Sequence, residues 1–143
     1  MPRSTLIPEA HLLLFRGDHI LLLRRQNTGY EDGNYSVIAG HIESDETARQ
    51  GMAREAFEEA GLIIQPQDLL LCHVMHRRDG TDRVGFFFRP QEWVGEPRNL
   101  EPQKCSDLSW FDMDSLPPNI IPYIRQAIRE TLQGSSYSEH GWQ

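Results

Sequence analysis

Three glutamates lie close together in one short segment, REAFEEAG, over residues 54–61. At about 100° per residue in a helix, Glu55, Glu58 and Glu59 fall at positions i, i+3 and i+4 and share one face. Like charges at this spacing destabilise a helix by roughly a few tenths of a kcal/mol per pair. A bound cation would compensate that repulsion, although the spacing alone favours the simpler interpretation of a solvated acidic face.

Two neighbouring residues shift the balance toward an ion site. Gly51 lies one turn before Glu55 on the same face, where glycine costs about 1 kcal/mol relative to alanine and leaves room for ions or phosphates. Arg54 lies among the acids. Mg²⁺ takes oxygen ligands and binds through a few carboxylates together with substrate phosphates. The cluster therefore has the composition of a site for a hard divalent cation.

A helix over 46–60 is predicted to carry these residues. Ser44 or Asp45 is the candidate N-cap, with acidic residues in the first turn, and Gly61 stands in the usual C-terminal capping position. The opposite arc is apolar and can pack on a sheet. It consists of Met52, Ala53, Ala56, Phe57 and Ala60.

Apolar runs on both sides of this helix predict strands. Residues 10–15 and 19–25 flank Gly17-Asp18 and read as a hairpin, and residues 69–78 and 82–90 flank Asp79-Gly80, a strong hairpin signal. Residues 27–35 are polar and predict a loop. A strand is also predicted at 35–40, another runs into the proline turn within 108–118, and a second helix spans 120–132 with Pro122 in its first turn.

The order of these elements indicates a mixed α/β layered domain. The chain has 143 residues, of which 38% are hydrophobic, enough for one domain, which we expect over 1–134. Residues 135–143 are polar, so a loose C-terminal tail is the default. The alternative is that Tyr137 and Trp142 dock on the domain or on a partner subunit.

Charge and cysteine content exclude several classes. The formal net charge is -7, so we expect no nucleic acid polymer as partner, and an anionic substrate would need local arginines or a metal. Cys72 and Cys105 form no C-x-x-C pair and are expected to be buried thiols. The apolar run 12–15 is broken at 16–18, too soon for a signal peptide or a membrane span, so we expect a cytoplasmic protein without membrane contact.

The stretch over 40–62, GHIESDETARQGMAREAFEEAGL, resembles the signature of the Nudix hydrolases. Leu62 fits its last aliphatic position, while Ala56 is small for the other. All its fixed positions are filled, namely by Gly40, Glu46, Arg54, Glu55, Glu58, Glu59 and Gly61. The resemblance implies an α/β fold, an α/β/α sandwich with a mixed β-sheet and a central metal-binding helix. It also implies hydrolysis of nucleoside diphosphates linked to another group.

The resemblance implies roles for individual residues. Glu55, Glu58 and Glu59 would hold Mg²⁺ or Mn²⁺, and the backbone carbonyl of Ala39 would approach the metal. Arg54 and Glu46 would orient the metal ligands. The implied step is attack by water at phosphorus, with the cations neutralising charge on the leaving phosphate.

Residues 95–119 also resemble the bacterial antimutator branch of this family, which removes 8-oxo-dGTP. Glu101 is then the candidate general base or additional metal ligand, or else an exposed loop glutamate. Arg25, or Arg24 if the strand register differs by one, would contact phosphate. Asn119 lies one residue away from the position of a base-reading asparagine, which leaves the guanine preference open.

The leading hypothesis is a Mg²⁺-dependent hydrolase that converts a small-molecule nucleoside triphosphate, ordinary or oxidised, to the monophosphate and pyrophosphate. ADP-ribose and nucleotide sugars remain alternative substrates, and a non-catalytic nucleotide sensor is a rival of another class. The loop over 27–35 and its residues Tyr30, Asp32 and Tyr35 could border the substrate, although tyrosines beside a strand are more often core or rim. Relatives in the family are often dimers, so a homodimer is possible.

Overall fold

The computed structural model describes residues 1–143 and contains two sheets and two α-helices. The larger sheet has the order β5-β1-β7-β6-β9, and in the smaller one β3 pairs with β2, β4 and β8. The strands are β1 (Ile7–Leu12), β2 (Phe15–Arg16), β3 (His19–Arg25), β4 (Tyr35–Ser36), β5 (Ala39–His41), β6 (Leu69–Asp79), β7 (Thr81–Pro90), β8 (Cys105–Asp112) and β9 (Tyr137–His140). The helices are α1 (Ala48–Ala60), α2 (Pro122–Leu132) and a 3-10 turn, η1 (Pro66–Asp68).

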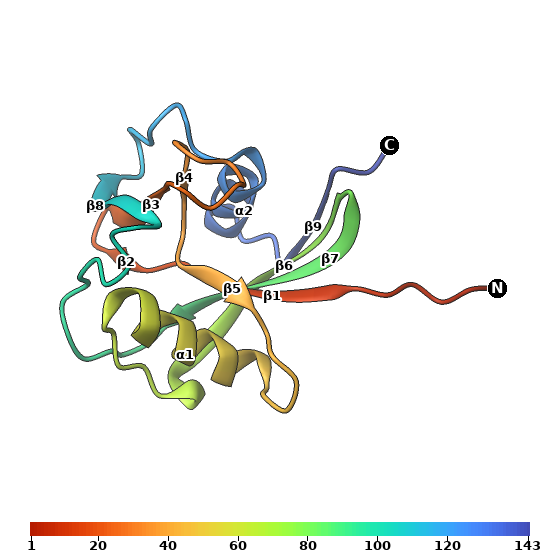
Figure 1. Cartoon of the computed structure of the whole chain (residues 1–143), viewed down its shortest axis with the longest axis horizontal. Helices are drawn as coiled ribbons and strands as arrows, with labels where there is room; N and C mark the ends of the chain where they lie inside the picture. Colours follow the sequence, from red (N-terminus) through yellow and green to blue (C-terminus); the bar gives the residue numbers. More distant parts are fainter.

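The helices cover opposite faces of the larger sheet, with α1 on one side and α2 on the other (Figure 1). This sheet is mixed, because β1 pairs parallel with β7 and β6 parallel with β9, whereas the β1/β5 and β6/β7 pairs are antiparallel. The predicted α/β/α sandwich with a mixed sheet is confirmed. No helix is both long enough and apolar enough to cross a membrane.

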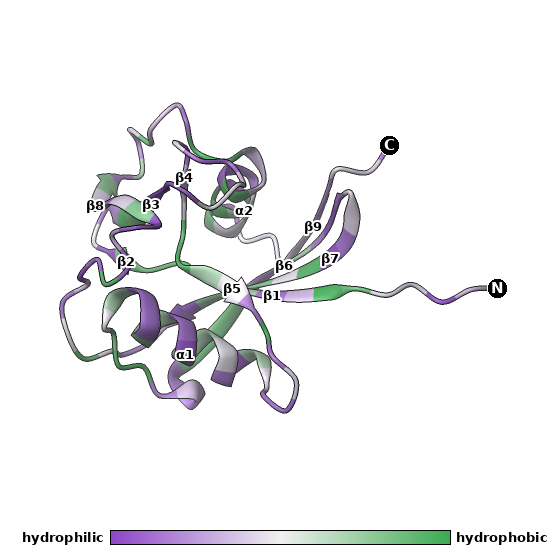
Figure 2. Ribbon diagram, viewed as in Figure 1, coloured by the Kyte–Doolittle hydropathy of each residue, from purple (hydrophilic) through white to green (hydrophobic).

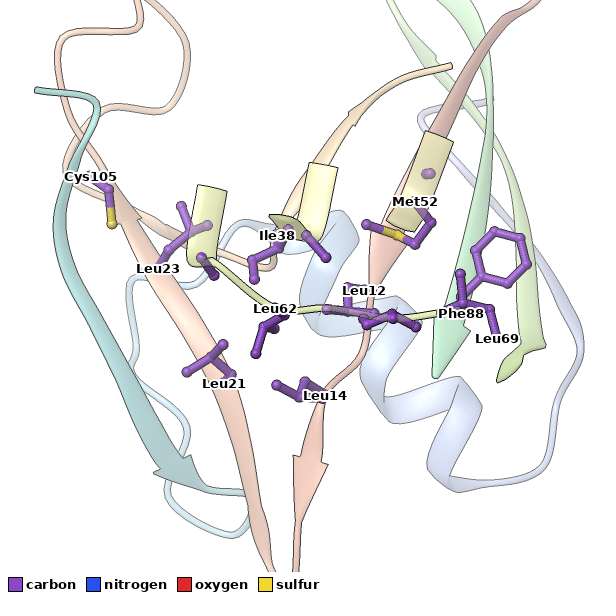
Figure 3. Packing of buried hydrophobic residues seen from close by; sticks show 14 residues of the cluster. Leu12, Leu14, Leu21, Leu23, Ile38, Met52, Leu62, Leu69, Phe88 and Cys105 are labelled. Atoms are coloured by element: carbon purple, nitrogen blue, oxygen red, sulfur yellow. The ribbon is translucent and has the colours of Figure 1, made fainter. Parts of the chain in front are cut away.

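Two hydrophobic clusters hold the layers together. One lies under α1 and the other under α2. Figure 3 shows the first cluster, with Leu21 and Leu23 of β3 on one side, Leu12 of β1 and Met52 of α1 on the other, and Leu62 between them. Figure 2 shows hydrophilic residues along much of α1, as expected for a helix with one buried face.

The helix α1 begins later than predicted. Its N-cap is Thr47, so Ser44 and Asp45 are wrong as caps, and the first turn holds no acidic residue. Thr47 Oγ1 accepts from the Gln50 amide (3.1 Å), and Gln50 Oε1 accepts from the Thr47 amide (2.8 Å), a reciprocal capping box. Gly61 ends the helix with φ +70°, which confirms the C-cap.

The hairpins follow the predictions in part. The β6–β7 hairpin turns at Gly80, as predicted. The first hairpin forms around Gly17 but is shorter than predicted, because only β2 pairs with the start of β3. The residues before it form β1, which pairs with β7 in the larger sheet. The strand predicted over 35–40 divides into β4 and β5, because the buried residues 37 and 38 connect the two sheets.

The default of a loose tail over 135–143 is wrong, and the docked alternative is what the structure shows. Residues 137–140 form β9, which pairs parallel with β6. His73 fixes this strand from the interior: its Nδ1 lies 2.8 Å from the Ser135 carbonyl and its Nε2 lies 2.7 Å from Ser138 Oγ. The Trp142 indole donates to the His76 carbonyl (3.0 Å).

Candidate active site

Arg54 organises the acidic face of α1. Its Nη2 and Nε donate to the two carboxylate oxygens of Glu46 (2.7 and 3.1 Å). Its Nη1 donates to Glu55 Oε1 (2.9 Å) and lies 3.4 Å from Glu58 Oε2, and Nη2 also reaches the His41 carbonyl (3.2 Å). The Arg54 guanidinium lowers the pKa of Glu46, chiefly through these hydrogen bonds. The Arg54 guanidinium therefore sets the positions of three carboxylates.

Two glycines allow the acids to approach the backbone. A Cβ at Gly40 of β5 would collide with the Glu55 carboxylate, and a Cβ at Gly51 would lie 2.9 Å from Glu46 Oε1. Neither glycine has positive φ, so the reason for glycine is space rather than backbone conformation. Glycine at position 51 is thus explained by the space that it leaves for the Glu46 carboxylate.

Glu59 is the acid of this cluster whose charged form is disfavoured by its surroundings. Burial raises its pKa well above the ordinary value, and the hydrogen bond and charge of Glu55 and the charge of Glu101 raise it further. The residue is half-buried, but its Oε2 is closed off from solvent and has no hydrogen-bond partner. A carboxylate oxygen so placed beside a second carboxylate is suited to a cation.

The carboxylates do not form a ready coordination shell. No group of three or more His, Cys, Asp or Glu side chains is arranged to hold a metal ion, and Arg54 instead occupies the space between Glu55 and Glu58. The donor set nevertheless fits a hard divalent cation, because all its side-chain donors are oxygens and one of them lacks any partner.

The cluster opens into a cleft of about 500 Å³. Most of the predicted site residues line it, namely Arg25, Ala39, Arg54, Glu55, Glu58, Glu59 and Glu101. Glu101 faces the cleft from a turn in which its carbonyl accepts from the amides of Lys104 and Cys105 (both 2.9 Å). Asn27 and Thr28 also line the cleft, and they belong to the loop over 27–35 that was expected to border the substrate. Sequence reasoning missed Asn99 and Lys104, which come from a loop whose position depends on the whole fold.

Of the three residues predicted to bind the substrate, only Arg25 lines the cleft. Arg25 lines the cleft and donates to the Tyr30 carbonyl (2.8 Å), whereas Arg24 donates to the Gly33 carbonyl (3.1 Å) and does not line the cleft. A register shift in the β3–β8 pair separates the two arginines. Asn119 also lies outside the cleft, where its side-chain amide donates to Gly33 (2.8 Å).

A second pocket of about 410 Å³ adjoins the cleft, since Arg25 and Ala39 line both. Sequence reasoning missed its floor, which is made by Glu9, His11, Arg77 and Tyr123. Burial lowers the pKa of His11 to about 4. The sequence feature that could have indicated this pocket is the presence of charged residues within the apolar strands β1 and β6.

Comparison with known proteins identifies the family. Residues 5–131 match the NUDIX domain. The chain is 32% identical over 127 residues to the NAD-capped RNA hydrolase NudC of Stutzerimonas stutzeri, covering 89% of this chain and 43% of that protein. It is 46% identical over 119 residues to NudC of Edwardsiella ictaluri, covering 82% and 44%. The chain thus spans less than half the length of these curated relatives.

Solved structures agree with this match. The MutT NUDIX hydrolase from Burkholderia pseudomallei has a TM-score of 0.80 and 26% identity, covering 88% of this chain and 98% of that one. The MutT protein from Methanosarcina mazei has a TM-score of 0.78 at 20% identity, covering 93% and 97%, which supports the fold. Because the family match covers residues 5–131, and four of the signature residues line one cleft, the chain belongs to the Nudix hydrolase family.

Proposed function

We propose that this protein is a Mg²⁺-dependent pyrophosphohydrolase whose substrate is a nucleoside triphosphate, ordinary or oxidised. Water adds to phosphorus, the bridging P–O bond breaks, and the nucleoside monophosphate and pyrophosphate separate. The observation that carries this proposal is the partnerless carboxylate oxygen of Glu59, which lies beside Glu55 in a cleft also lined by Arg25 and Lys104. Acids for a cation and bases for phosphates therefore line the same space.

The residues of the cleft divide the work. Glu55, Glu58, Glu59 and the Ala39 carbonyl would hold Mg²⁺ or Mn²⁺. When bound, such cations neutralise phosphate charge and lower the pKa of water. Arg54, anchored by Glu46, holds Glu55 and Glu58 in orientation, and the loss of such supporting contacts commonly costs about 10- to 100-fold.

Other side chains serve the substrate. Arg25 and Lys104 would donate to phosphate oxygens, for which guanidinium and ammonium groups are suited. Glu101 faces the same cleft from a separate loop. We assign it the removal of a proton from the attacking water, or an additional metal contact.

A second candidate substrate is a dinucleotide with an internal diphosphate. It is favoured by the curated relatives, which are named as hydrolases of NAD-capped RNA. Those names also run against our expectation that no nucleic acid polymer is bound, because the substrate they name is an RNA. The signature acts on the diphosphate, so the attached group is decided elsewhere in the molecule.

The test is product analysis of the purified protein with Mg²⁺. Substrates are nucleoside triphosphates, 8-oxo-dGTP, NAD, ADP-ribose and nucleotide sugars, and the assay separates pyrophosphate from orthophosphate. We expect metal-dependent pyrophosphate from a triphosphate, and we expect Glu58→Gln to lower turnover by orders of magnitude with the fold intact. A folded Glu58→Gln variant of near-normal activity would exclude Glu58 as a ligand, and activity confined to NAD would favour the second candidate.

A further inference from the structure

Arg77 of β6 lies at the floor of the second pocket with 5% of its surface exposed. Its Nη2 donates to Glu9 Oε1 (2.8 Å), and this is the only hydrogen bond of its side chain. Nη1 lies 3.5 Å from Asp79 Oδ2, which is long for a hydrogen bond. A guanidinium carries five donors, so most donors of this buried cation lack a protein acceptor.

Those donors are not sealed in the protein, and Arg77 lines the second pocket. Nε and Nη1 are not among the side-chain atoms that are both cut off from solvent and partnerless. The guanidinium carbon of Arg77 lies 3.8 Å from the centroid of the Tyr123 ring, which supports its flat face. Tyr123 is itself held by His11, whose Nε2 lies 3.1 Å from the hydroxyl. The guanidinium is therefore held in place at the second pocket with donors that lack a protein acceptor.

Glu9 holds this arrangement in place. Its second oxygen, Oε2, accepts from Arg83 Nη1 (2.7 Å), so one carboxylate serves two guanidiniums. Removing three charged groups from water is expensive, and apolar residues in their place are often neutral or stabilising for the fold. Fold stability alone thus gives little reason for the cluster, whereas a ligand with acceptor atoms does.

The walls of the pocket indicate the shape of that ligand. Tyr30, Ile121 and Ala39 offer aromatic and aliphatic surface, and Asp79 stands nearer the solvent, with a half-exposed side chain. The pocket meets the cleft at Arg25 and Ala39. A flat heteroaromatic ring connected to the phosphates fits this layout, with its acceptor group directed to the floor.

We propose that Arg77, positioned by Glu9, is a specificity-determining residue that donates hydrogen bonds to a keto oxygen of the substrate's nucleobase. This inference rests on the proposed nucleotide substrate. A base with an amino group at the same place would direct a donor at a donor, and a buried donor left unpaired weakens binding. Asp79 would accept from the ring N–H that adjoins the keto oxygen.

Matched nucleoside monophosphates test the inference by titration calorimetry without metal. Inosine and adenosine monophosphates differ at position 6 by keto against amino, and uridine and cytidine monophosphates differ likewise at position 4. We expect the keto member of each pair to bind at least tenfold more tightly. Arg77→Gln should remove that preference, whereas Arg16→Gln, which alters an exposed ion pair with Glu96, should keep it.

The outcomes separate this inference from the proposed function. Equal affinities within each pair, a preference that survives in folded Arg77→Gln, or no binding of any of the four by a protein that hydrolyses triphosphates would overturn the role of Arg77. If Arg77→Gln does not fold, Arg77→Lys and Glu9→Gln decide, since both should weaken the preference. Calorimetry measures binding alone, so a protein without pyrophosphohydrolase activity could still show the keto preference. The product assay described above supplies the hydrolysis result for the same protein.

Discussion

At the scale of single residues, the site depends on atoms that are missing as much as on those present. Gly40 and Gly51 stand where a Cβ would displace Glu55 and Glu46 respectively. The two differ in severity, because a Cβ at Gly40 would overlap the whole carboxyl group of Glu55, whereas at Gly51 the nearest atoms would be one oxygen of Glu46 (2.9 Å) and its carboxyl carbon (3.3 Å). Activity should therefore respond to the two positions unequally.

We expect Gly40→Ala to lower kcat by about 10- to 100-fold, the usual cost of a disturbed ligand orientation. Gly51→Ala serves as the matched comparison and should cost less activity, since the end of a glutamate side chain can shift and alanine is the better helix former by about 1 kcal/mol. Steady-state kinetics together with urea unfolding measures both. A larger loss at Gly51 than at Gly40 would contradict this order.

At the scale of elements, α1 shows how far local sequence determines structure. Its acidic face and its glycine C-cap follow from spacing within a few residues, and both were predicted. Its N-terminus was not, because Ser44 and Asp45 have the right residue types while the capping box depends on the pair Thr47 and Gln50. Asp45 instead adopts a left-handed conformation (φ +68°) in the preceding turn.

The cap gives a direct prediction. Thr47→Ala should lower the free energy of unfolding by about 1 kcal/mol, since one donor at the helix start loses its acceptor. For a chain of this length the melting temperature should fall by roughly 3 °C. Ser44→Ala should leave both unchanged. Urea and thermal unfolding measure both effects. An equal loss of stability in the two variants would contradict the assignment of Thr47 as the N-cap.

At the scale of the whole molecule, burial of charge links the fold to pH. His11 lies in β1 with 1% of its surface exposed, and burial lowers its pKa to about 4, against 6.5 for an exposed histidine. Between these values the unfolded chain binds a proton that the folded chain does not. Stability should therefore rise with pH from about 4 to 6.5 and fall as the pH is lowered.

The expected size is about 3 kcal/mol, at 1.36 kcal/mol for each unit of pKa difference. His11→Gln should lose that part of the pH dependence, so its stability deficit relative to the natural chain should narrow by about this amount between pH 7 and pH 4. His19→Gln is the control, because His19 is exposed. Urea unfolding at a series of pH values measures it, and a deficit independent of pH would refute the assignment.

Long-range pairing explains what could not be predicted. Glu55, Glu58 and Glu59 lie within five residues of one another, so their assembly could be predicted. In contrast, Glu9 and Arg77 meet only because β1 and β6 flank β7. The docking of β9 depends in the same way on His73, more than sixty residues earlier. Neither contact produces a hydrophobic or charge periodicity in the sequence from which it could have been predicted.

The register between β1 and β5 fixes the position of the second pocket relative to the cleft. Glu9 faces His41, Ala10 faces Gly40 and His11 faces Ala39. In β1, Glu9 and His11 belong to the pocket floor, while in β5 Gly40 makes room for Glu55. A slip of one residue would turn Glu9 and His11 to the other face of the sheet and displace Gly40 from Glu55. A single insertion inside β1 or β5 would therefore disrupt both cavities at once.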